Sequence, residues 1–179
     1  GTWDFSYQKK YNNKILKLYY QHFFEDTSSL RFANQTDGLW GVELTNYIPS
    51  STILLEYIDI SNANKDALYQ NDYYYSNYQY VEGWKYKDNI IGNPFINTDG
   101  SNAGFQKHMK AIHIGTKGKI GLSHYEIKAL RKINTHDSFK YKILIGRKFN
   151  NLDLNMFVVN NGNNHGVGMK IAYVVSNKK

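Results

Sequence analysis

The stretch F-K-Y-K-I-L-I-G-R-K-F-N-N-L-D-L-N-M-F-V-V, residues 139–159, decides the fold of this chain. Apart from Arg147, large apolar side chains occupy every second position on both sides of Asn150-Asn151, and lysine, aspartate and asparagine stand among the positions between them. A period of two is the pattern of a β-strand whose two faces differ. Asparagine tolerates the positive φ of a tight turn. The stretch therefore predicts two antiparallel strands joined at Asn150-Asn151.

The same period of two recurs on both sides of this hairpin and predicts nine strands in all, with no helix. Downstream, a connection at 160–165 leads to a last strand over 167–175. Upstream, two strands are predicted around a turn at Lys117-Gly118. The other alternating segments are separated by short turns at 11–13 and 49–51 and by a polar loop at 25–38. The upstream strands cover residues 3–7, 16–24, 40–45, 53–60, 108–115 and 119–131.

The lengths of the strands and of their connections favour a barrel in a membrane. Most of the predicted strands are about 8 to 12 residues long, whereas soluble strands most often have about 5–6 and a tilted membrane strand needs about 9–11. Short connections alternate with long ones, and the longest spans residues 61–106. Outer-membrane barrels combine short periplasmic turns with long extracellular loops. The sequence predicts an all-β fold, an antiparallel up-and-down transmembrane β-barrel.

The count of strands predicts that this barrel is incomplete. A complete bacterial barrel has an even number of strands, and both of its ends lie on the periplasmic side. With the long loops outside the cell, the first of nine strands would begin outside. We therefore expect residues 1–179 to be a single C-terminal portion of a larger barrel, incomplete at its N-terminal side.

The charge of the chain is unevenly distributed. Residues 1–105 carry 8 Lys and Arg against 12 Asp and Glu, whereas residues 106–179 carry 14 against 3. A basic second half indicates an anionic partner such as phospholipid, lipopolysaccharide, nucleic acid or an acidic polysaccharide. The acidic first half argues against nucleic acid. The chain has no cysteine, which excludes disulfides and cysteine metal sites.

An aromatic segment, residues 69–95, lies inside the longest predicted connection and holds seven of the sixteen tyrosines. Long loops on a rigid scaffold commonly carry function. Aromatic rings stack on the apolar faces of sugars, and their polar edges hydrogen-bond hydroxyl groups. An alternative is that these rings form an interfacial girdle or the small core of the loop. The candidate glycan-binding residues are Tyr73, Tyr74, Tyr75, Tyr78, Tyr80, Trp84 and Tyr86.

A second candidate site is a basic lumen. If the alternating apolar positions around Leu18, Ile143 and Val167 face lipid, the lysines between them face inward. A lysine at the lipid midplane would cost about 2–4 kcal/mol, so a barrel requires this assignment. Several like charges in one cavity concentrate a polyanion; a solvated face without a ligand is the alternative. The predicted lumen residues are Lys17, Lys140, Lys142, Lys148 and Lys170.

Patterns for catalysis and for metals are weak. Glu25, Asp26 and Asp37 flank one loop, but neighbouring residues on a strand point to opposite faces, and glycoside hydrolysis needs two facing carboxylates. The segment 97–102 offers Asp and Asn oxygens of the kind that bind Ca²⁺. The six histidines show no metal-ligand spacing. We expect a non-enzymatic protein with no catalytic residue, no metal and no cofactor.

Several short segments between residues 19 and 95 are similar in sequence to a known family. They are Y-Y-Q-H-F-F-E-D at 19–26, D-G-L-W-G-V-E-L at 37–44, L-E-Y at 55–57, Y-Y at 73–74, G-W-K-Y at 83–86 and I-G-N-P-F at 91–95. In this order they resemble the C-terminal half of the capsule assembly Wzi family of outer-membrane proteins. The resemblance covers roughly residues 15–115, and beyond it only the strand pattern agrees.

This resemblance implies a transmembrane β-barrel in the outer membrane of a Gram-negative bacterium. It implies a lectin that holds or organises capsular polysaccharide at the cell surface, and it transfers no catalytic residue. The expected partners are capsular or other surface polysaccharide, outer-membrane lipid and other outer-membrane proteins, without nucleic acid.

Two alternatives remain from the residues alone. Period-two strands with Tyr-, Trp- and Asn-rich loops also suit a soluble β-sandwich carbohydrate-binding module. A glycan-active enzyme fits less well, because the sequence offers no pair of carboxylates on one face. Recovery of the protein in buffer without detergent separates the soluble module from the barrel.

Overall fold

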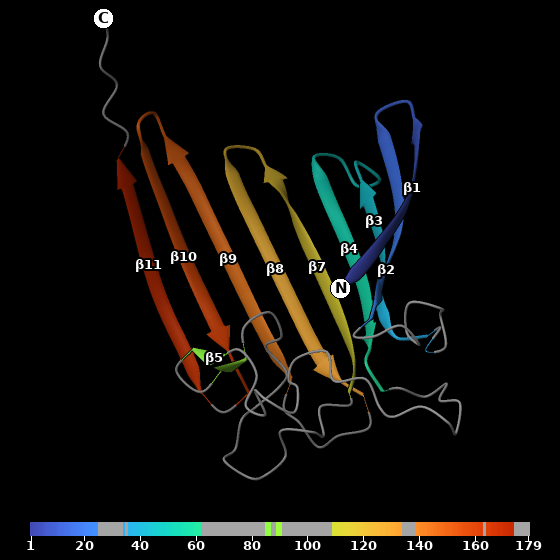
Figure 1. The fold of residues 1–179 in the computed structure, drawn as a ribbon. Helices are drawn as coiled ribbons and strands as arrows, with labels where there is room; N and C mark the ends of the chain where they lie inside the picture. The colour runs from blue at the N-terminus through green and yellow to red at the C-terminus, as the bar shows by residue number, and fades with distance from the viewer. Residues whose placement is uncertain are drawn as a thin grey trace, which may run out of the picture. The chain divides into compact units, whose positions relative to one another are not determined.

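The computed structural model describes residues 1–24, 34, 36–61, 85–86, 89–90, 109–133, 139–162 and 164–173 (Figure 1). The chain divides into two compact units. Unit 1 consists of Gly1–Phe5, Tyr19–Trp40 and Tyr57–Ala111, and unit 2 consists of Ser6–Leu18, Gly41–Glu56 and Ile112–Lys179.

Nine strands form one sheet, hydrogen-bonded in the order β1-β2-β3-β4-β7-β8-β9-β10-β11. Their bounds are β1 Thr2–Tyr11, β2 Lys14–Phe23, β3 Gly38–Thr45, β4 Ser51–Asp59, β7 Lys110–Ile120, β8 Ser123–Lys132, β9 Lys140–Phe149, β10 Leu152–Asn160 and β11 His165–Tyr173. Two short strands, β5 (Lys85–Tyr86) and β6 (Asn89–Ile90), pair separately. The order follows the chain, so the predicted all-β, antiparallel up-and-down sheet of nine strands is confirmed.

The described residues contain no helix. Within those same ranges, no helix is long and apolar enough to cross a membrane.

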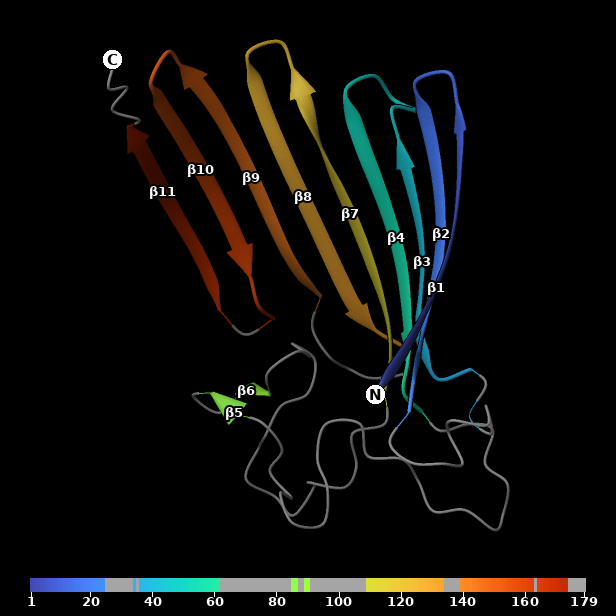
Figure 2. The same cartoon turned by 45° about the horizontal axis from the view of Figure 1, so that its top comes forward.

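Four tight turns join neighbouring long strands in the described part of unit 2, at one end of its strands (Figure 2). Asn12 and Asn150 have φ of 54° and 50°, in the left-handed region that asparagine tolerates. The predicted turns at Asn12-Asn13 and Asn150-Asn151 are therefore confirmed. The β3–β4 turn contains Asn46 and Ser50, with φ of 59° and 56°.

The turn predicted at Lys117-Gly118 is wrong. Both residues lie inside β7, and the turn is made by Gly121-Leu122, where Gly121 has a φ of 59°. Gly118 is needed for space instead, because a Cβ there would lie 2.8 Å from Oη of Tyr125 and 2.9 Å from the carbonyl oxygen of Ser50. Glycine inside a strand often marks such a close approach.

In unit 1, an aromatic ladder crosses β1, β2 and β3. The ring of Tyr20 stacks on Trp40 with centroids 3.9 Å apart and on Phe5 with centroids 6.3 Å apart. The Tyr20 hydroxyl donates to the carbonyl oxygen of Asp37 at 3.0 Å and lies 2.8 Å from Nδ1 of His22. His22 and Asp37 are fully buried. These contacts hold the end of β2 against the start of β3.

A second polar cluster closes the end of β4 in the same unit. Asp59 is buried and accepts hydrogen bonds from the Tyr57 hydroxyl at 3.0 Å and from the backbone N–H of Ser61 at 2.9 Å. Lys110, at the start of β7, forms an ion pair with Asp59 at 3.0 Å. Residues far apart in sequence thereby tie the two strands that flank the longest connection.

The buried apolar side chains among the described residues all belong to unit 1. They are Ile60, Met109 and Ala111. Unit 2 instead leaves many of its large apolar side chains exposed, among them Ile145, Met156 and Met169. The stability of its sheet therefore depends on what surrounds that exposed face.

Candidate functional site

The two faces of β8–β11 in unit 2 differ sharply in chemistry. Residues that pair across antiparallel strands share a face, and successive residues alternate between faces. The pairing Tyr125–Ile145–Met156–Met169 crosses all four strands on one face. Ile145, Met156 and Met169 are 60%, 59% and 61% exposed. We call this side of β8–β11 the apolar face.

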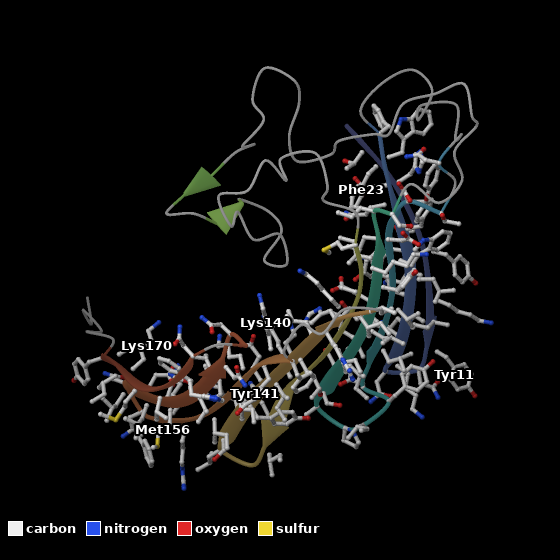
Figure 3. The ribbon with its side chains drawn as sticks, turned by 90° about the horizontal axis from the view of Figure 1, so that it is seen from below. Tyr11, Phe23, Lys140, Tyr141, Met156 and Lys170 are labelled. Carbon is white, nitrogen blue, oxygen red and sulfur yellow. The ribbon has the colours of Figure 1, made fainter. Side chains whose placement is uncertain are left out.

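The opposite side, here the polar face, carries the lysines of these strands. In β9, Lys140, Lys142 and Lys148 alternate with the apolar positions, and Lys148 pairs with Asp153 of β10. Asn155 lies two residues after Asp153 and therefore on the same face, and it pairs with Lys170 of β11. All four lysines thus share this face. Figure 3 shows Lys140 and Lys170 on one side of the strands and Met156 on the other.

A pocket of about 930 Å³ lies in unit 2, with residues of the polar face along its wall. Strands β3, β4 and β7–β11 all contribute to its lining. Its apolar wall includes Leu144, Phe157 and Val159. Its charged lining consists of Lys117, Lys119, Lys142, Lys170 and Glu126.

A row of polar residues crosses the floor of this pocket. His124 of β8 and Asn155 of β10 both pair with Gly146 of β9, and Asn155 also pairs with Lys170 of β11. Nε2 of His124 lies 2.7 Å from Oδ1 of Asn155, so the hydrogen bond passes over Gly146. A Cβ at position 146 would overlap both of these atoms. The glycine therefore makes the contact between β8 and β10 possible.

The next row is mainly apolar and contains an aromatic ring. Phe157 pairs with Leu144 on one side and with Gly168 on the other. A Cβ on Gly168 would overlap the ring of Phe157, so the ring lies over this glycine. Phe157 is half-buried and lines the pocket. An aromatic ring therefore lies on the pocket wall next to the row that contains His124 and Asn155.

Charge in the pocket is unbalanced. Glu126 binds Nζ of Lys128 at 2.6 Å, and it also interacts electrostatically with Lys142 and Lys117. Lys128 neutralises Glu126 from outside the lining, so the lining lysines supply a net positive charge. A cavity lined mainly by one sign of charge attracts ligands of the opposite sign.

The predicted lumen lysines divide into two groups. Lys142 and Lys170 line the pocket. Lys140 and Lys148 share the polar face but lie outside the lining. Lys17 is half-buried in β2, alternates with the exposed Leu18 and also lies outside the lining.

Sequence reasoning missed other residues of the pocket. Lys117 was overlooked because it was assigned to a turn, and Lys119 because it was assigned to the strand after that turn, whereas both lie in β7. His124 and Asn155 are 31 residues apart, and only the register of β8, β9 and β10 brings them together. Alternation along β10 groups Asn155 with Phe157 on one face, and this pattern could have identified both as candidate pocket residues.

The predicted aromatic platform lies almost entirely outside the described residues. This applies to Tyr73, Tyr74, Tyr75, Tyr78, Tyr80 and Trp84. Tyr86 belongs to β5, where its backbone pairs with Asn89. The glycan-binding role of these residues stays a prediction.

The acidic residues considered for catalysis or metal binding are not brought together in the described structure. Asp37 is buried in the Tyr20 cluster of unit 1, whereas Glu25, Asp26 and the segment 97–102 lie outside the described residues. Across the described ranges, no group of three or more His, Cys, Asp or Glu side chains has the arrangement of a metal site.

Comparison with known proteins agrees with the resemblance in the sequence. No curated protein and no solved structure matches the chain significantly. The sequence model of one family, described as capsule assembly protein Wzi, matches residues 1–110. Most residues of the pocket lining come after residue 110 in the sequence, outside the matched region. Because the match extends over more than half of the 179 residues, the chain belongs to the capsule assembly protein Wzi family.

Proposed function

We propose that this chain is part of an outer-membrane β-barrel that binds and anchors capsular polysaccharide at the surface of a Gram-negative bacterium, as a lectin without enzymatic activity. Membership of the Wzi family supports the role in capsule assembly. The single observation that carries the membrane part is the apolar face of β8–β11.

The apolar face suits lipid better than water. Val167, Met169 and Ile171 take every second position of β11, and Val167 is 79% exposed. Contiguous apolar patches are rare on soluble monomers and mark contacts with lipid or protein. The lysines of these strands lie on the other face, which is the distribution that a membrane barrel needs, because each lysine at the midplane would cost about 2–4 kcal/mol.

The polar face supports the binding part of the proposal. Its pocket presents Lys142 and Lys170 beside an aromatic ring, and such a surface attracts an anionic glycan. The aromatic segment 69–95 is proposed as a further contact for the polysaccharide. Outer-membrane lipid and other outer-membrane proteins remain the proposed additional partners, and nucleic acid is not among them.

Fractionation of cells that produce the full-length protein tests this function. We expect the protein in the outer-membrane fraction, released only by detergent, and we expect loss of cell-bound capsule when its gene is deleted. A soluble periplasmic protein in the same cells serves as the control for fractionation.

Two results would contradict the proposal. Recovery of a monomer in buffer without detergent would exclude the barrel and favour the soluble β-sandwich carbohydrate-binding module. Shortening of purified capsular polysaccharide by the purified protein would replace the lectin by an enzyme.

A further inference from the structure

We propose that the pocket of unit 2 binds a hexuronate unit of an acidic polysaccharide, with the sugar ring against Phe157 and the carboxylate against Lys142 or Lys170. This inference rests on the proposed function, because it assumes that surface polysaccharide reaches the polar face. It adds the chemical class of the sugar and the residues that recognise it.

The register places one lysine on each side of the Phe157 ring. Lys142 of β9 pairs with Val159, two residues after Phe157, and Lys170 of β11 pairs with Asn155, two residues before it. Both lysines are therefore diagonal neighbours of Phe157 on the same face. Diagonal neighbours lie about 7–8 Å apart, within reach of long side chains.

The ring itself provides the surface for a sugar. The side chain of Phe157 leans over Gly168, and Leu144 lies beside it on the neighbouring strand. The apolar face of a pyranose stacks on aromatic rings of this kind. A bare phosphate or sulfate would use the lysines but gain nothing from the ring.

The lining of the same pocket also includes neutral polar groups. The hydroxyl oxygens of Thr45 and Thr52 lie 3.5 Å apart, and both residues line the pocket. The linked side chains of His124 and Asn155 form its floor. These groups offer hydrogen bonds to sugar hydroxyls. Glu126 forms its ion pair with Lys128, which lies outside the lining, so the four lining lysines still give the pocket an excess of positive charge.

Isothermal titration of the full-length protein in detergent micelles tests the proposal. The probes are tetragalacturonate, its full methyl ester, neutral maltotetraose and inorganic phosphate. We expect tetragalacturonate to bind and each of the other three to bind at least about tenfold more weakly, since each lacks the ring or the charge.

Variants assign the binding to the named residues. Phe157→Leu and Lys142→Gln should each weaken tetragalacturonate binding by about fivefold or more, the effect of losing one good contact. Phe157→Tyr keeps the ring and should retain the binding, which covers the case in which the leucine variant fails to fold. Lys148→Gln removes a charge from the same face outside the pocket, and Phe139→Leu removes an exposed ring outside the pocket. Both control variants should bind as the unaltered protein does.

The outcomes separate this inference from the proposed function. Equal affinity for phosphate and tetragalacturonate, or normal binding by Phe157→Leu, would overturn the hexuronate site and leave a simple anion site. Absence of tetragalacturonate binding by a protein that resides in the outer membrane and retains capsule would overturn this inference alone. A water-soluble monomer that still binds tetragalacturonate through Phe157 would support the site and refute the barrel.

Discussion

At the scale of single residues, Gly146 has the largest consequence for the pocket. It is the position over which His124 and Asn155 meet at 2.7 Å, and it carries no side chain that would separate them. The hydrogen bond joins two strands that do not pair directly, because β9 lies between them. The absence of a Cβ at Gly146 therefore allows His124 and Asn155 to form the floor of the pocket.

The variant Gly146→Ala tests this role. The new Cβ would push the side chains of His124 and Asn155 apart, so we expect a loss of about 1–3 kcal/mol in the free energy of unfolding. The measurement is urea unfolding of the protein in lipid vesicles, followed by circular dichroism.

Gly166→Ala is the matched control for that variant. Gly166 lies on the same face in β11, and a Cβ there would approach only Cγ2 of Val159, at 3.2 Å. We expect this change to be nearly neutral. An equal loss of stability in the two variants would show that glycine matters at these positions for another reason.

At the scale of elements, β11 shows how one strand serves two environments. Met169 belongs to the apolar face, whereas its neighbour Lys170 and the nearby Ala172 belong to the polar face. Ala172 pairs with Asp153 of β10. The two sides of the strand should therefore respond oppositely to a new positive charge.

Arginine substitutions on the two faces of β11 test this difference. Met169→Arg should destabilise the protein in lipid vesicles by about 2–4 kcal/mol, because a cation enters the lipid-facing surface. Ala172→Arg places the same side chain opposite Asp153 and should change stability little. The same urea titration compares them, and equal losses would contradict a lipid-facing assignment of Met169.

The elements themselves were largely predictable from local chemistry. The turns at Asn12 and Asn150 follow from the tolerance of asparagine for positive φ, and both occur. The turn predicted at Lys117-Gly118 does not occur, because Gly118 lies inside a strand and provides space for Tyr125 and Ser50. A single glycine in a sequence does not reveal whether it serves a turn or a tertiary contact.

The candidate pocket was less predictable than the strands. Alternation groups Lys140, Lys142 and Lys148 along one strand, but it does not relate them to Lys170 of another. That relation depends on the register of β10 with both of its neighbours, as does the position of Phe157. Pairing registers arise from contacts across the whole sheet, and a strand pattern alone does not contain them.

At the scale of the whole molecule, the segregation of charge along the chain acquires a physical meaning. The basic excess after residue 105 falls mainly on β7–β11, where lysines line the pocket. Attraction of a polyanion by such a surface depends on salt, because the screening length falls from about 8 Å at physiological ionic strength to about 3 Å at 1 M.

Salt therefore separates the two proposed properties of the molecule. Raising sodium chloride to about 1 M should weaken tetragalacturonate binding severalfold in titration calorimetry. The requirement for detergent should stay unchanged, because lipid contact depends on apolar surface. Sorbitol at matched osmolality is the control, and binding that resists salt would argue against recognition through lysines.

The row from His124 to Lys170 also specifies how the strands align during folding. A shift of β9 by two residues keeps every side chain on its face, yet it brings Leu144 or Lys148 to the place of Gly146. Either side chain would block the meeting of His124 and Asn155. The correct alignment is the one in which Gly146 of β9 lies between His124 of β8 and Asn155 of β10. Gly146 therefore helps to select the correct register of β9. A register shifted by two residues keeps the apolar residues on their face, but it loses the contact between His124 and Asn155.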